Sequence, residues 1–302
     1  MKKMFFNDRD TIIRLTPEWK GERLPDGRPK VSQDILRRMR NITFEEAWAP
    51  LWDRGYRNNW ECSFKVTSPG SVLVGRAVTA VMVPKRPDLD QVLMDIGTKE
   101  EGHKGFFNQW VIDNLVEDDV VVVDLYDKIF EGTYVGGNLS TAIRTRTKTG
   151  GAVIWGGVRD LQQIAEMENF QIFYRGTDPT GIGNCSMTGY NMPCRIGQAI
   201  CMPGDVVLGT ISGVIFIPAH LAETVVVRAE KNHVRDFFGF DRLKSGTYTT
   251  AQIDRMWTVA MMEDFLDWFQ KDPRADEYRH LTWEEEMEES RRMENEENRP
   301  NN

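Results

Sequence analysis

Short apolar runs alternate with helical segments between Ser71 and Pro218, and this alternation constrains the fold more than any other feature of the sequence. Residues 137–148 and 161–169 have the length and spacing of helices. The runs at 120–123 and 152–155 are continuously apolar, as expected for strands buried on both faces of a parallel sheet. The pattern therefore predicts an α/β core. Its β-rich runs cover residues 72–83, 119–125, 151–155, 172–174, 195–201, 205–210 and 214–217.

The segments on either side of this core differ from it in composition. Residues 1–40 mix charges with prolines and glycines, which predicts an N-terminal arm that wraps a surface. Ser32 is placed to cap one helix, and Thr43 with Glu46 forms the capping box of the next. After Pro218 we expect a helix to residue 230, a break at 237–240 and an amphipathic helix over 250–270. We therefore predict an arm at 1–40, an α/β domain at 41–230 and a helical extension at 231–302.

The end of the chain is strongly acidic. Residues 271–302 hold eleven acidic and six basic side chains, so they carry −5 of the formal net charge of −8. Such a charge run is usually a solvated face, and we expect an exposed helix with disorder beyond Asn295. The acidic balance gives no general attraction for a phosphate backbone, so nucleic acid is not an expected partner.

Membrane and secretory signals are absent from the sequence. No stretch approaches the roughly eighteen uninterrupted apolar residues of a membrane span, and charges begin before an apolar signal region can develop. The four cysteines lack C-x-x-C spacing and nearby paired histidines, which argues against a zinc cluster or a disulfide framework. We expect a cytoplasmic protein with no membrane partner.

The segment GGAVIWGGVRD, which ends at Arg159 and Asp160, is the strongest candidate for chemistry. A buried strand leads into two glycines, which let a backbone approach a ligand closely, and then into the start of a helix with free amides. Arg159 can bind a carboxylate through two hydrogen bonds while Asp160 holds a hard cation beside it. Spacing alone gives equal weight to a structural alternative, in which Asp160 caps its helix and Arg159 pairs with a surface acid.

A second strand-to-helix turn, YVGGNLS, precedes the first by one βα unit. Successive amides of Gly136, Gly137, Asn138 and Leu139 would form a nest for a carboxylate or an α-keto acid. A metal ion and Arg159 would then polarise the carbonyl group of that ligand. The alternative is that this segment is a simple tight turn.

Common catalytic signatures are missing. The sequence has no P-loop, no H-E-x-x-H, no G-x-S-x-G and no G-x-G-x-x-G after a strand, which removes the usual support for nucleotide-binding and serine-hydrolase functions. The four histidines are far apart, and we assign none of them to a metal site.

These segments together resemble the RraA-like family. That family includes 4-hydroxy-4-methyl-2-oxoglutarate/4-carboxy-4-hydroxy-2-oxoadipate aldolases, RraA regulators of ribonuclease E and proteins formerly labelled dimethylmenaquinone methyltransferases. The resemblance spans about residues 40–230, and its parts follow the family order. They are VGRAVT ending at Thr79, the glycine turn at 135–140, GGVRD ending at Asp160, PGDVV from Pro203 and GVIFIP ending at Pro218.

The resemblance implies a swivelling β/β/α domain that assembles as a homo-trimer or a hexamer. It also implies a lyase dependent on Mg²⁺ or Mn²⁺ that cleaves a hydroxylated keto acid or sugar-derived acid, by retro-aldol cleavage or decarboxylation, to pyruvate or a related enolate. By position, Arg159 would bind the keto acid and stabilise its enolate, Asp160 would hold the metal, and residues 136–139 would cradle the carboxylate.

The sequence also departs from the aldolases of that family. Asn138 stands where they carry an aspartate, Ala49 stands where an acid commonly precedes the glycine equivalent to Gly55, and SGTYT from Ser245 replaces a Gly-Glu segment. The alternative function is therefore a non-catalytic, RraA-type regulator that binds a protein. The insertion at 102–110 is unusual as well, and we interpret it as part of an interface in preference to a pocket wall.

Overall fold

The computed structural model describes residues 4–297, and the chain divides into two compact units, Met1–Val226 and Val227–Asn302. The division falls inside helix α8 (Ala222–Lys244). The domain boundaries that the sequence suggests at residues 40 and 230 remain predictions. Among the described residues, none of the helices has the length and the apolar character needed to cross a membrane.

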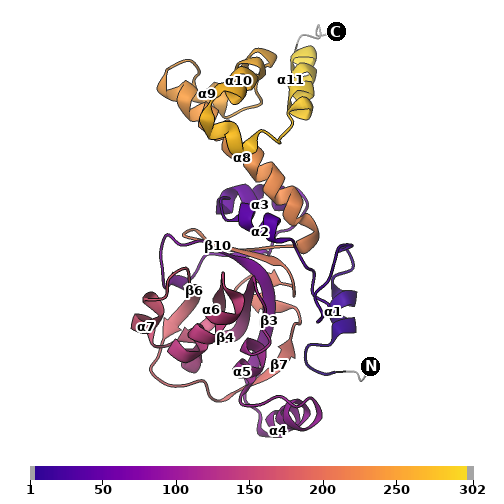
Figure 1. The fold of residues 1–302 in the computed structure, drawn as a ribbon, viewed down its shortest axis with the longest axis vertical. Helices are drawn as coiled ribbons and strands as arrows, with labels where there is room; N and C mark the ends of the chain where they lie inside the picture. Colours follow the sequence, from indigo (N-terminus) through magenta and orange to yellow (C-terminus); the bar gives the residue numbers. More distant parts are fainter. Residues whose placement is uncertain (1–3, 298–302) are drawn as a thin grey trace. The chain divides into compact units, whose positions relative to one another are not determined.

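The elements of the first unit agree with the alternation predicted from the sequence (Figure 1). Its helices before α8 are α1 (Arg9–Leu15), α2 (Gln33–Met39), α3 (Phe44–Trp52), α4 (Pro87–Asp95), the π-helix η1 (Ile96–Glu100), α5 (Phe107–Ile112), α6 (Gly137–Thr147), α7 (Leu161–Ala165) and the 3-10 helix η2 (Ala219–Leu221). Its strands are β1 (Trp60–Glu61), β2 (Lys65–Val66), β3 (Leu73–Pro84), β4 (Asp119–Val135), β5 (Gly151–Val158), β6 (Gln171–Thr177), β7 (Cys185–Tyr190), β8 (Cys194–Ile196), β9 (Ala199–Cys201), β10 (Val206–Thr210) and β11 (Gly213–Ile217).

Nine strands of the described chain form one mixed sheet, in the order β1-β11-β10-β3-β4-β5-β6-β2, with β7 pairing with β3. Strands β3, β4, β5 and β6 are parallel and adjacent. Helices α5, α6 and α7 lie in the crossover connections between them, as parallel strands require. The carboxyl ends of these strands therefore meet at one edge of the sheet.

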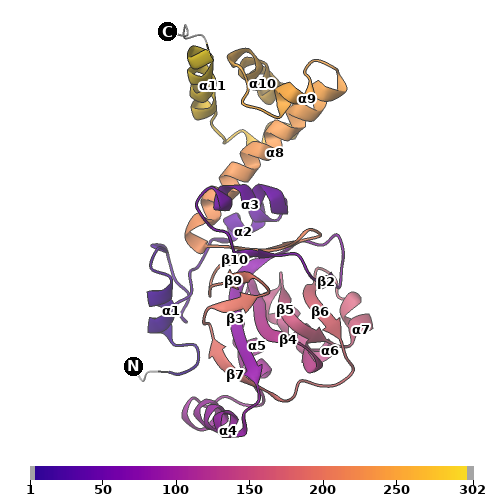
Figure 2. The same ribbon diagram turned by 180° about the vertical axis from the view of Figure 1, so that it is seen from behind.

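Successive side chains along the central strands point to opposite faces of the sheet, and they fill one apolar core on each face. Val121, Val123 and Ile154 face the helical layer, where residues of α5, α6 and α7 complete the cluster. Val122 and Val153 face the opposite layer. There the two-stranded β8–β9 hairpin covers the sheet, as seen from behind in Figure 2. This two-sided burial explains the continuous apolar runs of β4 and β5.

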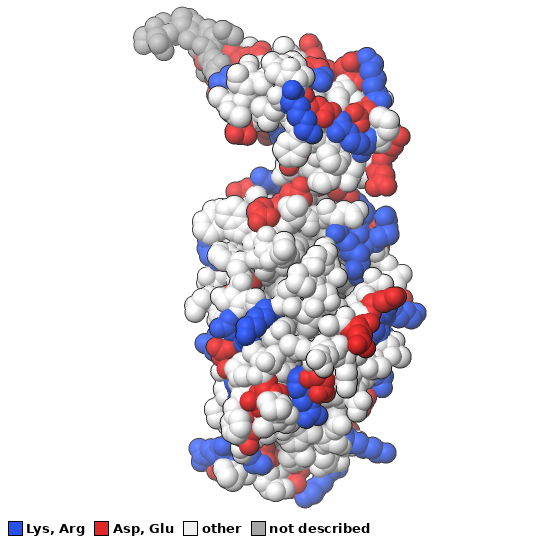
Figure 3. Space-filling view, turned by 90° about the vertical axis from the view of Figure 1, so that its left-hand side faces the viewer, with Lys and Arg blue, Asp and Glu red and all other residues white. Residues whose placement is uncertain are grey.

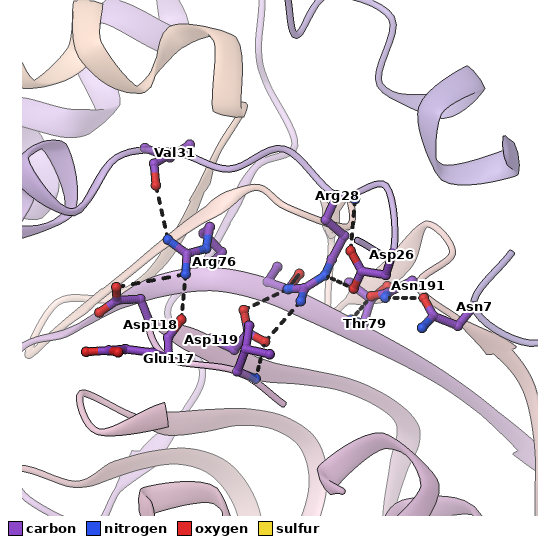
Figure 4. A network of polar contacts seen from close by, with 12 residues as sticks. Asn7, Asp26, Arg28, Val31, Arg76, Thr79, Glu117, Asp118, Asp119 and Asn191 are labelled. Atoms are coloured by element: carbon purple, nitrogen blue, oxygen red, sulfur yellow. Dashed lines mark hydrogen bonds and ion pairs between the residues drawn. The ribbon is translucent and has the colours of Figure 1, made fainter. Parts of the chain in front are cut away.

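The N-terminal arm is fixed to the sheet by a buried ion pair (Figure 4). Arg28 donates two hydrogen bonds to Asp119, with its Nη1 2.8 Å from Oδ1 and its Nη2 3.0 Å from Oδ2. Both side chains are almost fully buried, at 2% and 0% exposure. Burial lowers the pKa of Arg28, but the carboxylates of Asp119 and Asp26 outweigh this effect and raise it overall. Residues of the N-terminal segment are therefore held against the sheet by a specific buried contact.

The second unit is helical and corrects two expectations from the sequence. Helix α8 continues to Lys244 without the break predicted at 237–240, and the helix predicted over 250–270 is divided into α9 (Thr250–Ile253) and α10 (Val259–Lys271). The 3-10 helix η3 (Pro273–Tyr278) and α11 (Glu284–Glu297) follow. Phe238, Phe265 and Trp283 lie in the core of this unit.

The acidic tail contains the helix expected from its sequence, α11. This helix is attached by polar contacts as well as by packing, because Lys231 pairs with Glu286 at 2.7 Å and Val259 donates its N–H to Glu294. The disorder predicted beyond Asn295 falls mainly on residues 298–302, which lie outside the described residues. On the face drawn in Figure 3, acidic and basic side chains are interspersed, so neither sign dominates that face.

Candidate functional site

The two glycine turns singled out in the sequence lie side by side at the carboxyl ends of β4 and β5. Val135 and Val158 are register partners at these ends, and the Arg159 N–H donates to the Val135 carbonyl oxygen at 3.1 Å. The residues that follow each partner, Gly136 and Arg159, must therefore be neighbours. Parallel pairing thus places segments more than twenty residues apart in the sequence around one cavity of about 280 Å³.

Arg159 and Asp160 form an ion pair at the mouth of this cavity. The Arg159 Nε lies 3.6 Å from Asp160 Oδ2, and the side chains are 44% and 39% exposed, so both are open to a ligand. Asp160 adopts a left-handed conformation, with φ of 57°, at the start of α7. Aspartate tolerates this region better than most residues do.

The Asp160 side chain does not cap α7, which excludes that part of the structural alternative. Its Oδ2 instead accepts a hydrogen bond from the Gly137 N–H at 3.0 Å, across the cavity. Gly136 allows this approach, because a Cβ atom there would lie 2.3 Å from Asp160 Oδ2 and 2.9 Å from Arg159 Nε. The missing side chain is therefore required by the close approach of the Arg–Asp pair.

The predicted amide nest is present only in part. The Gly137 N–H donates to the Asp160 side chain, and the Ser140 N–H donates to the Gly136 carbonyl oxygen within the first turn of α6. In the described part of the chain, the N–H groups of Asn138 and Leu139 have no partner. Unpaired amides at the start of an eleven-residue helix attract anions through their partial charge and the helix dipole.

Further walls of the cavity come from segments that sequence reasoning did not assign to it. Asn108, from the insertion at 102–110, lines the cavity, and its Nδ2 donates to the Tyr134 carbonyl oxygen at 2.8 Å. The insertion therefore contributes to the pocket wall, a role that the sequence interpretation ranked second. The remaining wall residues that were missed are Thr133, Tyr134, Gln163, Gly181 and Ile182.

The cavity offers few groups for metal binding or proton transfer. Among its lining residues, Asp160 is the only carboxylate, and there is no histidine, lysine or cysteine. The described residues contain no group of three His, Cys, Asp or Glu side chains that could enclose a metal ion. Any cation beside Asp160 would therefore need neutral oxygens as its other ligands, from water, the substrate and the amide side chains of the lining, a pattern common for Mg²⁺.

A second cavity, of about 410 Å³, lies beside the N-terminal arm and is mostly apolar. Charged side chains of Glu18, Arg57 and Asp205 also line it. Tyr56 and His220 are in contact there, with the phenol oxygen 3.4 Å from Nε2. Burial raises the pKa of Tyr56 and lowers the pKa of His220, so both groups are neutral near pH 7. This cavity lacks the paired guanidinium and carboxylate of the first, which makes the Arg159–Asp160 cavity the better candidate for chemistry.

Solved structures with the same fold come from several bacteria. Streptomyces coelicolor RraAS2, described as an unusual member of the RNase ES inhibitor RraA protein family, has a TM-score of 0.58 and 22% identity over 74% of this chain and 98% of its own. An uncharacterized protein from Pseudomonas syringae gives a TM-score of 0.58 and 21% identity, over the same shares. At these identities the similarity shows the fold alone.

Sequence similarity connects the chain to a curated protein as well. A protein of Halalkalibacterium halodurans, named as a candidate 4-hydroxy-4-methyl-2-oxoglutarate aldolase, is 31% identical over 123 residues. The match covers 39% of this chain and 55% of that protein, so the chain spans about half the length of this relative. The model of the RraA-like family, described as Aldolase/RraA, matches residues 48–216, which include both glycine turns. The chain belongs to the RraA-like family.

Proposed function

We propose that this protein is a carbon–carbon lyase, dependent on Mg²⁺ or Mn²⁺, that acts on a keto acid in the Arg159–Asp160 cavity. Its products would be pyruvate or a related enolate. The observation that carries the proposal is the pairing of an open guanidinium with an open carboxylate, 3.6 Å apart, at the end of a buried parallel strand. Family membership and the aldolase-like relative support it.

Arg159 is the residue placed to bind the negative charge of the substrate. A guanidinium can donate two parallel hydrogen bonds to a carboxylate or to an enolate oxygen, and its charge does not depend on pH in the physiological range. Asn138 and Leu139 line the same cavity, and their N–H groups, which have no partner among the described residues, can hold the second end of a dicarboxylate. Donors fixed before the reaction stabilise the developing oxyanion without reorganisation.

In this proposal, Asp160 holds the metal ion. Only its Oδ2 has a partner among the described residues, which leaves Oδ1 for a cation. The amide oxygens of Asn138 and Gln163, both lining the cavity, are further hard ligands. This all-oxygen donor set fits Mg²⁺ or Mn²⁺ and does not fit a thiolate-bound or imidazole-bound metal. A divalent ion bound there would act as a Lewis acid on the ketone oxygen.

The lack of a base among the lining residues favours decarboxylation over retro-aldol cleavage. Retro-aldol cleavage requires a group that removes the proton of the substrate hydroxyl, whereas loss of CO₂ from a β-keto acid requires only that the enolate be stabilised. Asp160 is the only lining carboxylate, and its Oδ2 is already held by Gly137 and Arg159. Oxaloacetate is therefore the first substrate to test, and hydroxylated keto acids come second.

The test is oxaloacetate decarboxylation with Mg²⁺ or Mn²⁺, corrected for the rate with metal alone. We expect Arg159→Gln to lower kcat/KM by about 10²-fold to 10³-fold, as for the loss of an oxyanion donor, and Asp160→Asn to remove the metal dependence. Asp113→Asn is the matched control, because this exposed aspartate pairs with Arg146 away from the cavity. Equal rates for wild type and Asp160→Asn would refute the proposal.

The second candidate is a non-catalytic protein that binds a partner, in the manner of RraA-type regulators. One observation favours it: with Asn138 in place of an acid, the cavity holds a single carboxylate. This function predicts wild-type protein without metal-dependent turnover on oxaloacetate or on hydroxylated keto acids. It also predicts that a protein partner remains bound to the Asp160→Asn variant.

A further inference from the structure

A third cavity lies at the opposite end of the parallel strands from the Arg159–Asp160 cavity. Its volume is about 520 Å³, and Gly151 and Gln171 begin β5 and β6 at or beside its wall. Three cationic side chains line it: Arg40 after α2, Arg144 in α6 and Lys148 at the end of α6. No aspartate or glutamate is among its lining residues. Positive charge is therefore concentrated in a chain whose net charge is −8.

The two guanidiniums of this cavity are bound mainly to neutral groups. Arg40 donates to the carbonyl oxygens of Val72 and Val74 over long distances, 3.5 and 3.3 Å. Arg144 donates to the carbonyl oxygens of Glu168 and Lys148. Carbonyl groups satisfy N–H donors but do not cancel a full positive charge. Both residues therefore keep charge and free donor capacity for an anion.

Among the residues that the structure describes, only one of the three cations has a carboxylate partner within ion-pair distance, and that pair is exposed. Lys148 lies 2.9 Å from Glu117, with the side chains 65% and 45% exposed, where such pairs contribute little. The charge of Asp118 acts on Arg40, but Asp118 is already engaged by Gln33 and Thr149. Burial lowers the pKa of Arg40, and the charge of Asp118 opposes that shift only in part.

Neutral donors complete the lining. Ser71 and Asn169 border the cavity together with Gly70 and Gly150, whereas the hydroxyl of Thr149, which also lines it, is donated to Asp118. Hydroxyl and amide groups beside two guanidiniums and an ammonium match a phosphate group, which accepts several hydrogen bonds and carries up to two negative charges. The cavity is also larger than a phosphate ion needs, so it leaves room for the body of a small phosphorylated molecule.

We propose that this cavity binds the phosphate group of a small anionic molecule, at a site separate from the Arg159–Asp160 cavity. Arg144 and Lys148 bind the phosphate oxygens directly, and Arg40 supplies further positive charge from the lining. The site lies at the amino ends of β5 and β6, whereas the residues of the proposed lyase follow the carboxyl ends of β4 and β5. The proposal does not depend on the lyase function.

The test is calorimetric titration of the full chain, without divalent metal and at constant ionic strength. The probes are inorganic phosphate, glucose 6-phosphate and glucose. We expect saturable binding of both phosphate compounds and none of glucose. Tighter binding of phosphate would identify the free ion as the ligand, and tighter binding of glucose 6-phosphate would identify a phosphorylated metabolite. Absence of saturable binding of either compound in the millimolar range would overturn the proposal.

Point variants identify the cavity in which phosphate binds. Arg144→Gln and Lys148→Asn should each raise Kd by about tenfold, because a charge-assisted hydrogen bond is lost. Asparagine suits position 148, where φ is +60°, so this variant removes charge without new backbone strain. Arg146→Gln is the matched control on the same helix, because Arg146 pairs with Asp113 outside the cavity.

One more variant separates the two anion sites. Arg159→Gln should leave phosphate binding unchanged, since Arg159 lines the other cavity. A loss of phosphate binding in Arg159→Gln, or an equal loss in Arg144→Gln and Arg146→Gln, would overturn the assignment to this cavity. A lack of lyase activity with intact phosphate binding would refute the proposed function alone.

Discussion

The most local test of the candidate site is Gly136→Ala, a change of one methyl group. The added Cβ would lie 2.3 Å from Asp160 Oδ2, whereas close carbon–oxygen contacts in proteins begin near about 3.3 Å. The carboxylate must therefore retreat by about 1 Å, which breaks its hydrogen bond to Gly137 and moves it relative to Arg159. A displacement of about 1 Å in a catalytic group costs on the order of 10²-fold in rate.

The assay compares kcat/KM for oxaloacetate with the affinity for Mn²⁺, measured by electron paramagnetic resonance. We expect Gly136→Ala to lose about 10²-fold in kcat/KM and to bind Mn²⁺ more weakly, while its free energy of unfolding changes by about 1 kcal/mol. Gly183→Ala is the control, because its Cβ would meet only ordinary contacts, 3.9 Å from the Glu131 Cβ. If Gly136→Ala keeps the activity and the Mn²⁺ affinity of Gly183→Ala, the close-approach argument is refuted.

Two stability measurements test the packing behind the site. Arg28→Met leaves Asp119 buried and unpaired, so the free energy of unfolding in urea should fall by about 3–5 kcal/mol, and a fall below about 1 kcal/mol would contradict the anchoring role of Arg28. Burial raises the pKa of Asp205 from its ordinary value of 3.8 to about 7, so the folded state loses stability as the pH rises from about 4 to 7. Asp205→Asn, which can still accept the Met202 N–H, should flatten this pH dependence and gain on the order of 2 kcal/mol at pH 8, and an unchanged pH profile of urea unfolding would contradict this.

The central sheet could be predicted from the sequence because its strands are long or continuously apolar. The runs at 72–83 and 151–155 correspond to β3 and β5, and the runs at 205–210 and 214–217 form the antiparallel β10–β11 hairpin. Strands β1 and β2 were missed because two residues carry no periodicity. Their positions are set by pairing with β11 and β6.

The wrong break at 237–240 has a packing explanation. A glycine between phenylalanines favours an interruption by local propensity, since glycine weakens a helix by about 1 kcal/mol. In the structure Phe238 is fully buried in the core of the second unit, and a Cβ on Gly239 would lie 3.1 Å from the Ile253 side chain. Tertiary packing therefore outweighs the low helix propensity of Gly239. The small residue allows a close contact, and α8 continues without a break.

The part of the candidate site that depends on where the strands end could be predicted from the sequence. Both turns carry glycines after apolar strands, and parallel pairing brings such ends together, so the sequence was enough to place Arg159 beside the turn at 136–139. The bond between Asp160 and Gly137 could not be predicted, because it depends on the left-handed backbone of Asp160. Asn108 could not be predicted either, because its approach depends on how the insertion at 102–110 folds back.

The register of β4 against β5 links these observations to the expected chemistry. Because Val135 pairs with Val158, the first helical amide after β4 reaches Asp160, and the carboxylate is oriented by the backbone without a further side chain. The single carboxylate that lines the cavity, Asp160, is therefore oriented by the backbone and available to bind a cation. The lining contains no second acid that could transfer a proton. A site built in this way stabilises charge and does not move protons. Decarboxylation should accordingly exceed retro-aldol cleavage in kcat/KM, and the reverse order would show that a base reaches the substrate from outside this cavity.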